Sequence, residues 1–130
     1  MHDKRSHERL IVIGDVTLKD ESNNSIIAEG FLDNISYSGA LIFLRKEIEQ
    51  GKDVLVEFKM SFLTMPICIK GRIKYIKQSL KYKYPVFKAG LEFSESDKGK
   101  VEYIIKRIHA VMAEKKRNQE NIEPPDFIAY

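Results

Sequence analysis

The segment before the first apolar stretch carries cations whose spacing suits ligand binding. Lys4 directly precedes Arg5, and Arg9 stands four residues further on, which gives an R-x-x-x-R pattern. A guanidinium group is planar, and its fork of donors can grip a phosphate or the edge of a base. By itself this pattern is equally typical of a solvated arm.

A second polar group has the pattern N-x-S-x-x-G and consists of Asn34, Ser36 and Gly39. It stands between two segments that are expected to be strands. In such a turn Asn and Ser side chains bond to nearby backbone groups, and Gly adopts a positive φ. The pattern therefore predicts a tight turn, with or without a ligand.

Apolar and polar residues alternate over most of residues 10–93, which is typical of half-buried strands. In the stretch 54–60, for example, Val54, Val56 and Phe58 alternate with Leu55 and Glu57. Polar turns separate the segments, and six short strands predict a mainly β domain, either a small antiparallel barrel or a sandwich. The strands are expected near 10–18, 25–33, 39–44, 54–60, 67–75 and 86–93, with a bulge or bend at Gly14.

The period changes after Phe93, and an amphipathic helix is expected over residues 96–117. Ser94 or Ser96 would cap its start. The helix would lie across the barrel or face a second subunit in a homodimer. Its apolar stripe consists of Val101, Ile104, Ile105, Ile108, Val111 and Met112.

Charge changes sign along the last third of the chain. Residues 98–117 carry seven Lys or Arg against two acids, whereas residues 118–130 carry three acids and no base. We interpret residues 118–130 as an acidic tail, either free or docked through Phe127, Ile128 and Tyr130.

Composition argues against several classes of protein. Lys and Arg number 22 and Asp and Glu 19, so the net charge of +3 is too small to indicate a nucleic-acid binder. Cys68 is the one cysteine, which excludes an internal disulfide or a multi-cysteine zinc site. Apolar runs are too short for a signal sequence or a membrane span, so a cytoplasmic protein is expected. His2, His7 and His109 have no metal-binding spacing, and no catalytic motif predicts an enzyme.

Residues 73–88 form a basic stretch without an acid. Lysines are interleaved with aromatic residues, an arrangement that could stack single-stranded nucleic acid. A solvated hairpin kept soluble by lysines is the alternative, and it is favoured because the ring stacking usually involves arginine, which is absent here. The residues are Lys74, Tyr75, Lys77, Lys81, Tyr82, Lys83, Tyr84, Phe87 and Lys88.

Taken together, these features resemble the PilZ domain family. That family has R-x-x-x-R at its N-terminal entry, [DN]-x-S-x-x-G at a strand turn, and a six-stranded barrel followed by a helix. Arg5 and Arg9 match the first motif, and the Asn34 group matches the second. The stretch 86–93 is similar to the family's closing strand. The resemblance covers about residues 4–115. It implies a PilZ domain over 1–117, with an arm at 1–9, a barrel at 10–93 and a helix at 96–117.

The resemblance implies that the ligand is cyclic di-GMP, a bacterial second messenger that would act as a regulatory ligand and not as a cofactor. Arg5 and Arg9 would then bind guanine edges and phosphates. Asn34 would accept from a guanine N–H, Ser36 would bond a phosphate or base, and Gly39 would permit close approach. Asn34 replaces an aspartate that is frequent in the family, and Ser38 stands where many members have a second glycine.

The same resemblance predicts a mechanism. An arm that is loose without ligand would close over the messenger, and the new surface would signal in trans to an unknown protein partner in motility, pilus or exopolysaccharide control. Lys4 precedes the arginine motif, where the family's side chain helps decide whether one ligand or a stacked pair binds. The alternative is a PilZ-like adaptor that binds a protein and no nucleotide.

Overall fold

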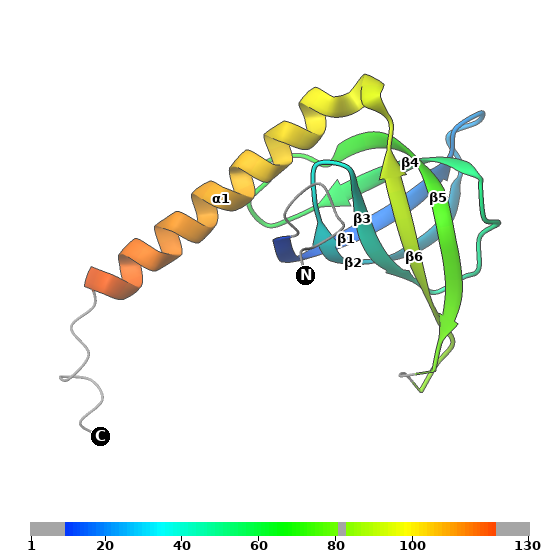
Figure 1. Cartoon of the computed structure of the whole chain (residues 1–130), viewed down its shortest axis with the longest axis horizontal. Helices are drawn as coiled ribbons and strands as arrows, with labels where there is room; N and C mark the ends of the chain where they lie inside the picture. Colours follow the sequence, from blue (N-terminus) through cyan, green and yellow to red (C-terminus); the bar gives the residue numbers. More distant parts are fainter. Residues whose placement is uncertain (1–9, 81–82, 122–130) are drawn as a thin grey trace, which may run out of the picture.

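The computed structural model describes residues 10–80 and 83–121, with the backbone alone for 118–121. In this part of the chain six antiparallel strands form a closed barrel in the order β1-β2-β3-β6-β5-β4 (Figure 1). The strands are β1 (Leu10–Asp20), β2 (Ile26–Ile35), β3 (Gly39–Leu44), β4 (Asp53–Lys59), β5 (Ile67–Ser79) and β6 (Val86–Phe93). The predicted antiparallel barrel is therefore confirmed, and the sandwich is wrong.

The alternating apolar and polar residues of each strand lie on the inner and outer faces of the barrel wall. Val54, Val56 and Phe58 of β4 are fully buried, and Ile69 and Ile73 of β5 meet them in the core. Burying one such side chain contributes about 1.5–3 kcal/mol relative to leaving it in water. A strand shifted by one residue would turn this face outward, so the core specifies the register.

Gly14 lies at an irregularity in β1, as predicted. The β1–β2 register shifts between Ile11 and Gly14. A Cβ atom at Gly14 would lie 2.8 Å from Cγ of Met60, so a larger residue here would require the Met60 side chain to shift. Pairing between β1 and β4 begins at Asp15 and Lys59. Residues 10–14 therefore continue past β4 and pair with β2 alone among the strands described.

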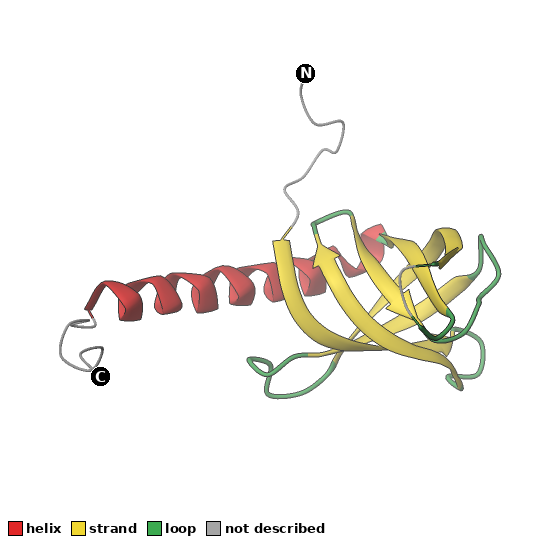
Figure 2. Ribbon diagram, turned by 90° about the horizontal axis from the view of Figure 1, so that it is seen from below, coloured by secondary structure: helices red, strands yellow, loops and turns green. Residues whose placement is uncertain are grey.

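The helix α1 (Lys98–Asn121) closes one end of the barrel with its first half. Val101, Ile104, Ile105 and Ile108 are at most 2% exposed within a single chain, because they pack onto the barrel core. The second half continues beyond the barrel (Figures 1 and 2). The predicted stripe is thus split, since Met112 is 50% exposed.

A short 3-10 turn, η1 (Glu95–Asp97), leads into α1, so the helix begins two residues later than expected. The Ser94 side chain accepts a hydrogen bond from the Ser96 amide and caps this turn. Asp97 accepts from the Lys70 amide at 2.7 Å, which ties the helix start to β5. No helix among residues 10–80 and 83–121 is long and apolar enough to cross a membrane.

Candidate functional site

The bend between β2 and β3 is held by Ser36. Its amide donates to the Gly39 carbonyl at 2.8 Å, and its hydroxyl donates to the same oxygen at 3.3 Å. The Ser36 hydroxyl also lies 3.3 Å from that of Ser38. Ser36 is only 1% exposed. Its hydroxyl therefore shapes the bend in this structure, and a contact from Ser36 to a ligand stays a prediction.

Gly39 has a different physical role from the one expected. It begins β3 and is not among the described residues with positive φ, so that expectation was wrong. A Cβ atom at this position would lie 2.0 Å from the Leu91 carbonyl oxygen. Glycine is needed here because β3 approaches β6 too closely for a side chain.

Asn34 lies on the outer side of β2, between β1 and β3. The register pairs it with Ile11 on one side and with Leu41 on the other. Its amide nitrogen donates to the Asp33 carboxylate at 2.8 Å, and the side chain is half-buried. This bond orients the amide at the barrel surface.

Lys4, Arg5 and Arg9 lie outside the residues that the structure describes. The point at which their segment joins the barrel is nevertheless defined. Leu10 pairs with Ile35, directly before Ser36. Opposite residues of antiparallel strands have Cα atoms about 4.5–5.5 Å apart. Leu10, the first residue described, therefore lies beside the N-x-S-x-x-G bend.

Asn34 belongs to a row of outward-facing positions that crosses five strands. The ladder pairs place Ile11, Asn34, Leu41, Gly90 and Tyr75 side by side. Neighbouring strands are about 4.8 Å apart, so the row spans about 19 Å along the curved wall. A hollow of about 390 Å³ lies over it, lined by Asn34, Ala40, Leu41, Lys74, Tyr75, Lys88, Gly90 and Leu91.

The floor of this hollow depends on Gly90. A Cβ atom at Gly90 would lie 2.3 Å from a ring carbon of Tyr75, so the tyrosine ring covers the glycine. The β5–β6 register shifts between Ile73 and Tyr75, and this irregularity turns Tyr75 onto the outer face. At 43% exposure the ring presents an aromatic surface on which a base could stack.

Two lysines place positive charge at the hollow. Lys74 lies 3.9 Å from the Glu92 carboxylate, but both side chains are more than half exposed. Such a surface pair contributes little and leaves the ammonium group accessible. Lys88 is half-buried on β6 and has no carboxylate partner within 4.0 Å among the described residues. Together they would attract an anion such as a phosphate.

Sequence reasoning did not connect Lys74, Tyr75 and Lys88 with Asn34. It placed them in the basic stretch 73–88, as a nucleic-acid platform or a solvated face. The outward parity of Lys74 and Lys88 was visible, but Tyr75 shared the parity of the buried Ile73, and only the register shift in β5 turns it outward. The β3–β6 and β5–β6 pairing then brings the three residues to one surface. Lys81 and Tyr82 of that stretch lie outside the described residues.

Other residues capable of chemistry lie apart from this face. Burial raises the pKa of the Cys68 thiol, which disfavours the reactive thiolate. His109 is exposed on α1. Arg72 and Asp53 form an ion pair at 2.8 Å, which raises the pKa of the guanidinium group and lowers that of the carboxyl. Among residues 10–80 and 83–121, no group of three His, Cys, Asp or Glu could hold a metal ion.

The family of the chain follows from a match to a family model. The model of the PilZ domain matches residues 3–109, a range that includes both polar motifs and the closing strand. The chain belongs to the PilZ domain family. A search of curated proteins finds no match.

Solved structures of PilZ proteins share the fold at low sequence identity. The PilZ domain with c-di-GMP of YcgR from Escherichia coli has a TM-score of 0.67 and 15% identity, and the match covers 92% of this chain and all of that one. MotI/DgrA, the inhibitor of motility of Bacillus subtilis, has a TM-score of 0.59 and 19% identity, and the match covers 84% of this chain and 53% of that one. The MrkH–c-di-GMP complex of K. pneumonia has a TM-score of 0.66 and 12% identity, and the match covers 88% of this chain and 56% of that one. This chain thus spans about half of the two larger proteins.

Proposed function

We propose that this PilZ protein is a receptor for cyclic di-GMP and that its site is assembled from the arm 1–9 and the outer face at Asn34. One observation carries the proposal. The pairing of Leu10 with Ile35 brings the root of the R-x-x-x-R arm to the bend at Ser36. The lysine-lined hollow with an aromatic floor lies beside this junction. The YcgR PilZ domain and MrkH share this fold, and each was solved with c-di-GMP, which supports the choice of ligand.

Each part of the site suits one part of the messenger. Arg5 and Arg9 would use their guanidinium forks on guanine O6 and N7 and on phosphate oxygens. The Asn34 amide would meet a guanine edge, with Ser36 and Gly39 holding the bend in place. Tyr75 would stack on a base, and Lys74 and Lys88 would neutralise phosphates, which extends the site beyond the two motifs of the sequence.

Ligand binding would convert the arm into part of a new surface. Ordering nine residues costs conformational entropy, which the charge-assisted contacts must exceed. The composite of arm and ligand would then engage or release a protein partner in trans, in the cytoplasm of a bacterium. Motility, pilus and exopolysaccharide systems are the candidate targets. No step of this mechanism requires catalysis.

Isothermal titration calorimetry with cyclic di-GMP tests the proposal and counts the ligands. Each charge-assisted hydrogen bond contributes about 1.5–3 kcal/mol, so Arg5→Ala or Arg9→Ala should weaken binding by about tenfold to a hundredfold. Arg117→Ala, which removes an exposed arginine of α1, is the matched control and should bind like the unmodified protein. Absence of binding at millimolar ligand would contradict the proposal.

Lys4 is expected to favour a stacked pair of messengers, because a long cation there would neutralise their additional phosphates. Two ligands per chain, reduced to one in Lys4→Ala, would support this role, and one ligand per chain in the unmodified protein would exclude it.

Two alternatives give different results in the same assay. An adaptor that binds only protein would give no heat with cyclic di-GMP. A single-strand binder would bind oligonucleotides of any sequence with a steep dependence on salt. A receptor should instead prefer cyclic di-GMP to a linear oligonucleotide of the same charge.

A further inference from the structure

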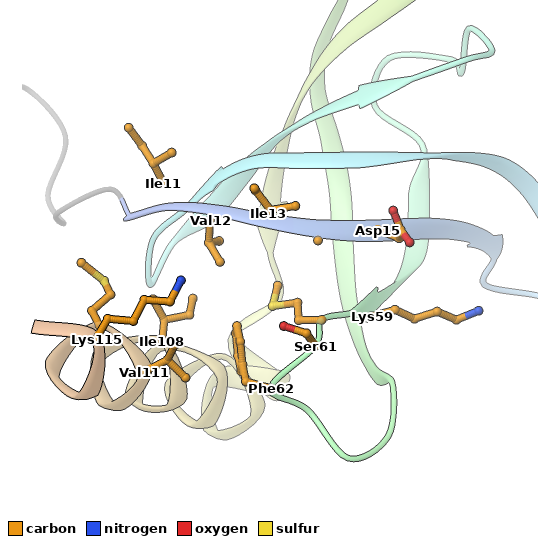
Figure 3. A pocket seen from close by; sticks show the side chains of 13 residues that line it. Ile11, Val12, Ile13, Asp15, Lys59, Ser61, Phe62, Ile108, Val111 and Lys115 are labelled. Carbon is orange, nitrogen blue, oxygen red and sulfur yellow. The ribbon is translucent and has the colours of Figure 1, made fainter. Parts of the chain in front are cut away.

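An apolar groove lies between the start of β1 and the second half of α1, on a different side of β1 from the hollow. Its volume is about 640 Å³. Val12 points toward α1, whereas Ile11 and Ile13 point away from it, and Phe62 stands between the strand and the helix (Figure 3). Besides Ile11 and Ile13, the apolar residues that line the groove are Val12, Met60, Phe62, Ile108, Val111 and Met112.

The groove exists because β1 and α1 both extend beyond the elements that they pack against. β4 ends at Lys59, so residues 10–14 have no strand beside them on that side in the part of the chain described. α1 likewise continues past the barrel, which leaves Val111 half-buried and Met112 50% exposed. A strand edge beside an apolar helix face is suited to an extended apolar segment.

We propose that the groove is the docking site of the chain's own residues 122–130, with Phe127 against Val111 and Met112 and Tyr130 near Phe62. This segment contains the apolar sequence Phe127–Ile128–Ala129–Tyr130. Pro124 and Pro125 precede it, and prolines do not continue a helix, so the chain can leave the axis of α1 there and turn back.

The segment is long enough to reach. Phe127 is six residues past Asn121 and can extend about 20 Å, whereas Met112 lies nine helical residues back, about 13.5 Å along the axis. Tyr130 can extend about 30 Å, and Ile108 lies about 20 Å back. Docking within one chain therefore requires no change in the helix or the barrel.

Charge favours the same occupant. Residues 118–130 contain three acids and no base, whereas the helix wall ends in Lys115, followed by Lys116 and Arg117. These three side chains are exposed. When the apolar residues occupy the groove, the acidic side chains of the same segment would lie close to these three basic residues. Opposite charges would then attract each other at the entrance of the groove.

Paramagnetic relaxation enhancement in the full chain tests the proposal without any messenger, so its outcome is independent of the proposed function. A spin label at Ala129→Cys, in a Cys68→Ser background, should broaden the amide signals of Val12, Phe62 and Val111. A label at Glu21→Cys, in the turn at the opposite end of β1, is the control and should leave these signals sharp.

Met112→Lys should abolish the broadening because it places a charge in the groove. Met65→Lys changes a methionine that is 69% exposed and does not line the groove, so it should leave the broadening intact. The proposal is overturned if the label at residue 129 broadens no groove signal, or if Met112→Lys has no effect. It is equally overturned if broadening appears only when labelled protein is mixed with isotope-enriched unlabelled protein, since the occupant would then be a second copy.

Discussion

Replacing Gly39 with alanine should destabilise the barrel even without a ligand. The new Cβ atom would lie 2.0 Å from the Leu91 carbonyl oxygen, whereas ordinary contact begins at 3.4 Å. That oxygen belongs to the backbone of β6, in the ladder that pairs Gly39 with Glu92 and Ala40 with Leu91. β3 and β6 would therefore have to separate by about 1.4 Å at this point.

The cost of this separation has two parts. Overpacking in a well-packed region typically costs about 1–3 kcal/mol. Each backbone hydrogen bond that is weakened adds about 0.5–1.5 kcal/mol, and two bonds flank the site of strain. The total of about 2–6 kcal/mol should lower the thermal midpoint by about 10 °C or more for a domain of this size.

Unfolding by heat and by urea, followed by far-ultraviolet circular dichroism without cyclic di-GMP, measures this effect. Gly99→Ala is the matched control, because no heavy atom lies within 4 Å of a Cβ built there. Alanine on α1 should leave stability unchanged or raise it by up to about 1 kcal/mol. If Gly39→Ala unfolds at the same midpoint as the unmodified protein, the steric argument is refuted.

Three further perturbations follow from the structure. Gly90→Ala should displace the Tyr75 ring and weaken cyclic di-GMP binding in calorimetry, with a stability loss of only about 1 kcal/mol because an exposed ring can rotate away; an unchanged affinity would contradict the stacking role of Tyr75. Ile104→Ala should lower the free energy of unfolding by about 2–5 kcal/mol in urea titrations, since it leaves a cavity between α1 and the barrel; a loss below 1 kcal/mol would argue against that packing. Hydrogen bonds from the Ser22 hydroxyl and amide, with Lys52 nearby, lower the pKa of Asp20 from 3.8 to about 2. The carboxyl group of Asp20 therefore binds a proton more tightly in the unfolded state than in the folded state. The ionised Asp20 stabilises the folded state above pH 4, and this contribution is lost as the pH falls toward 2. Asp20→Asn should therefore reduce the decline in stability between pH 4 and 2, and an unaltered decline would show that Asp20 does not contribute.

The elements of the fold were predictable because their signals are local. Val54, Val56 and Phe58 alternate with polar neighbours, and this period of two requires only a strand with one buried face. Val101, Ile104 and Ile105 likewise specify the buried side of a helix. β5 extends to Ser79, past the predicted end near residue 75, because pairing of Ser79 with Val86 lengthens the hairpin, and pairing is not a local property.

The candidate site was predictable only in part. The R-x-x-x-R and N-x-S-x-x-G motifs were recognisable as patterns, but the sequence suggested a positive φ for Gly39. The structure instead gives a steric reason, contact with Leu91, a residue 52 positions away along the chain. Lys74, Tyr75 and Lys88 carried no motif, so nothing in their spacing connected them with Asn34.

The sequence by itself determined the order of strands and helix, the buried face of each, and the two polar motifs, because these depend on residue type and on periods of two and 3.6. Only the tertiary structure decided which distant residues share a surface. The β1–β2 register sets Leu10 opposite Ile35, next to Ser36, and the β3–β6–β5 pairing brings Tyr75 over Gly90 in line with Asn34. Register arises from packing of the whole core at once, and a local pattern carries no record of which strand will become its neighbour.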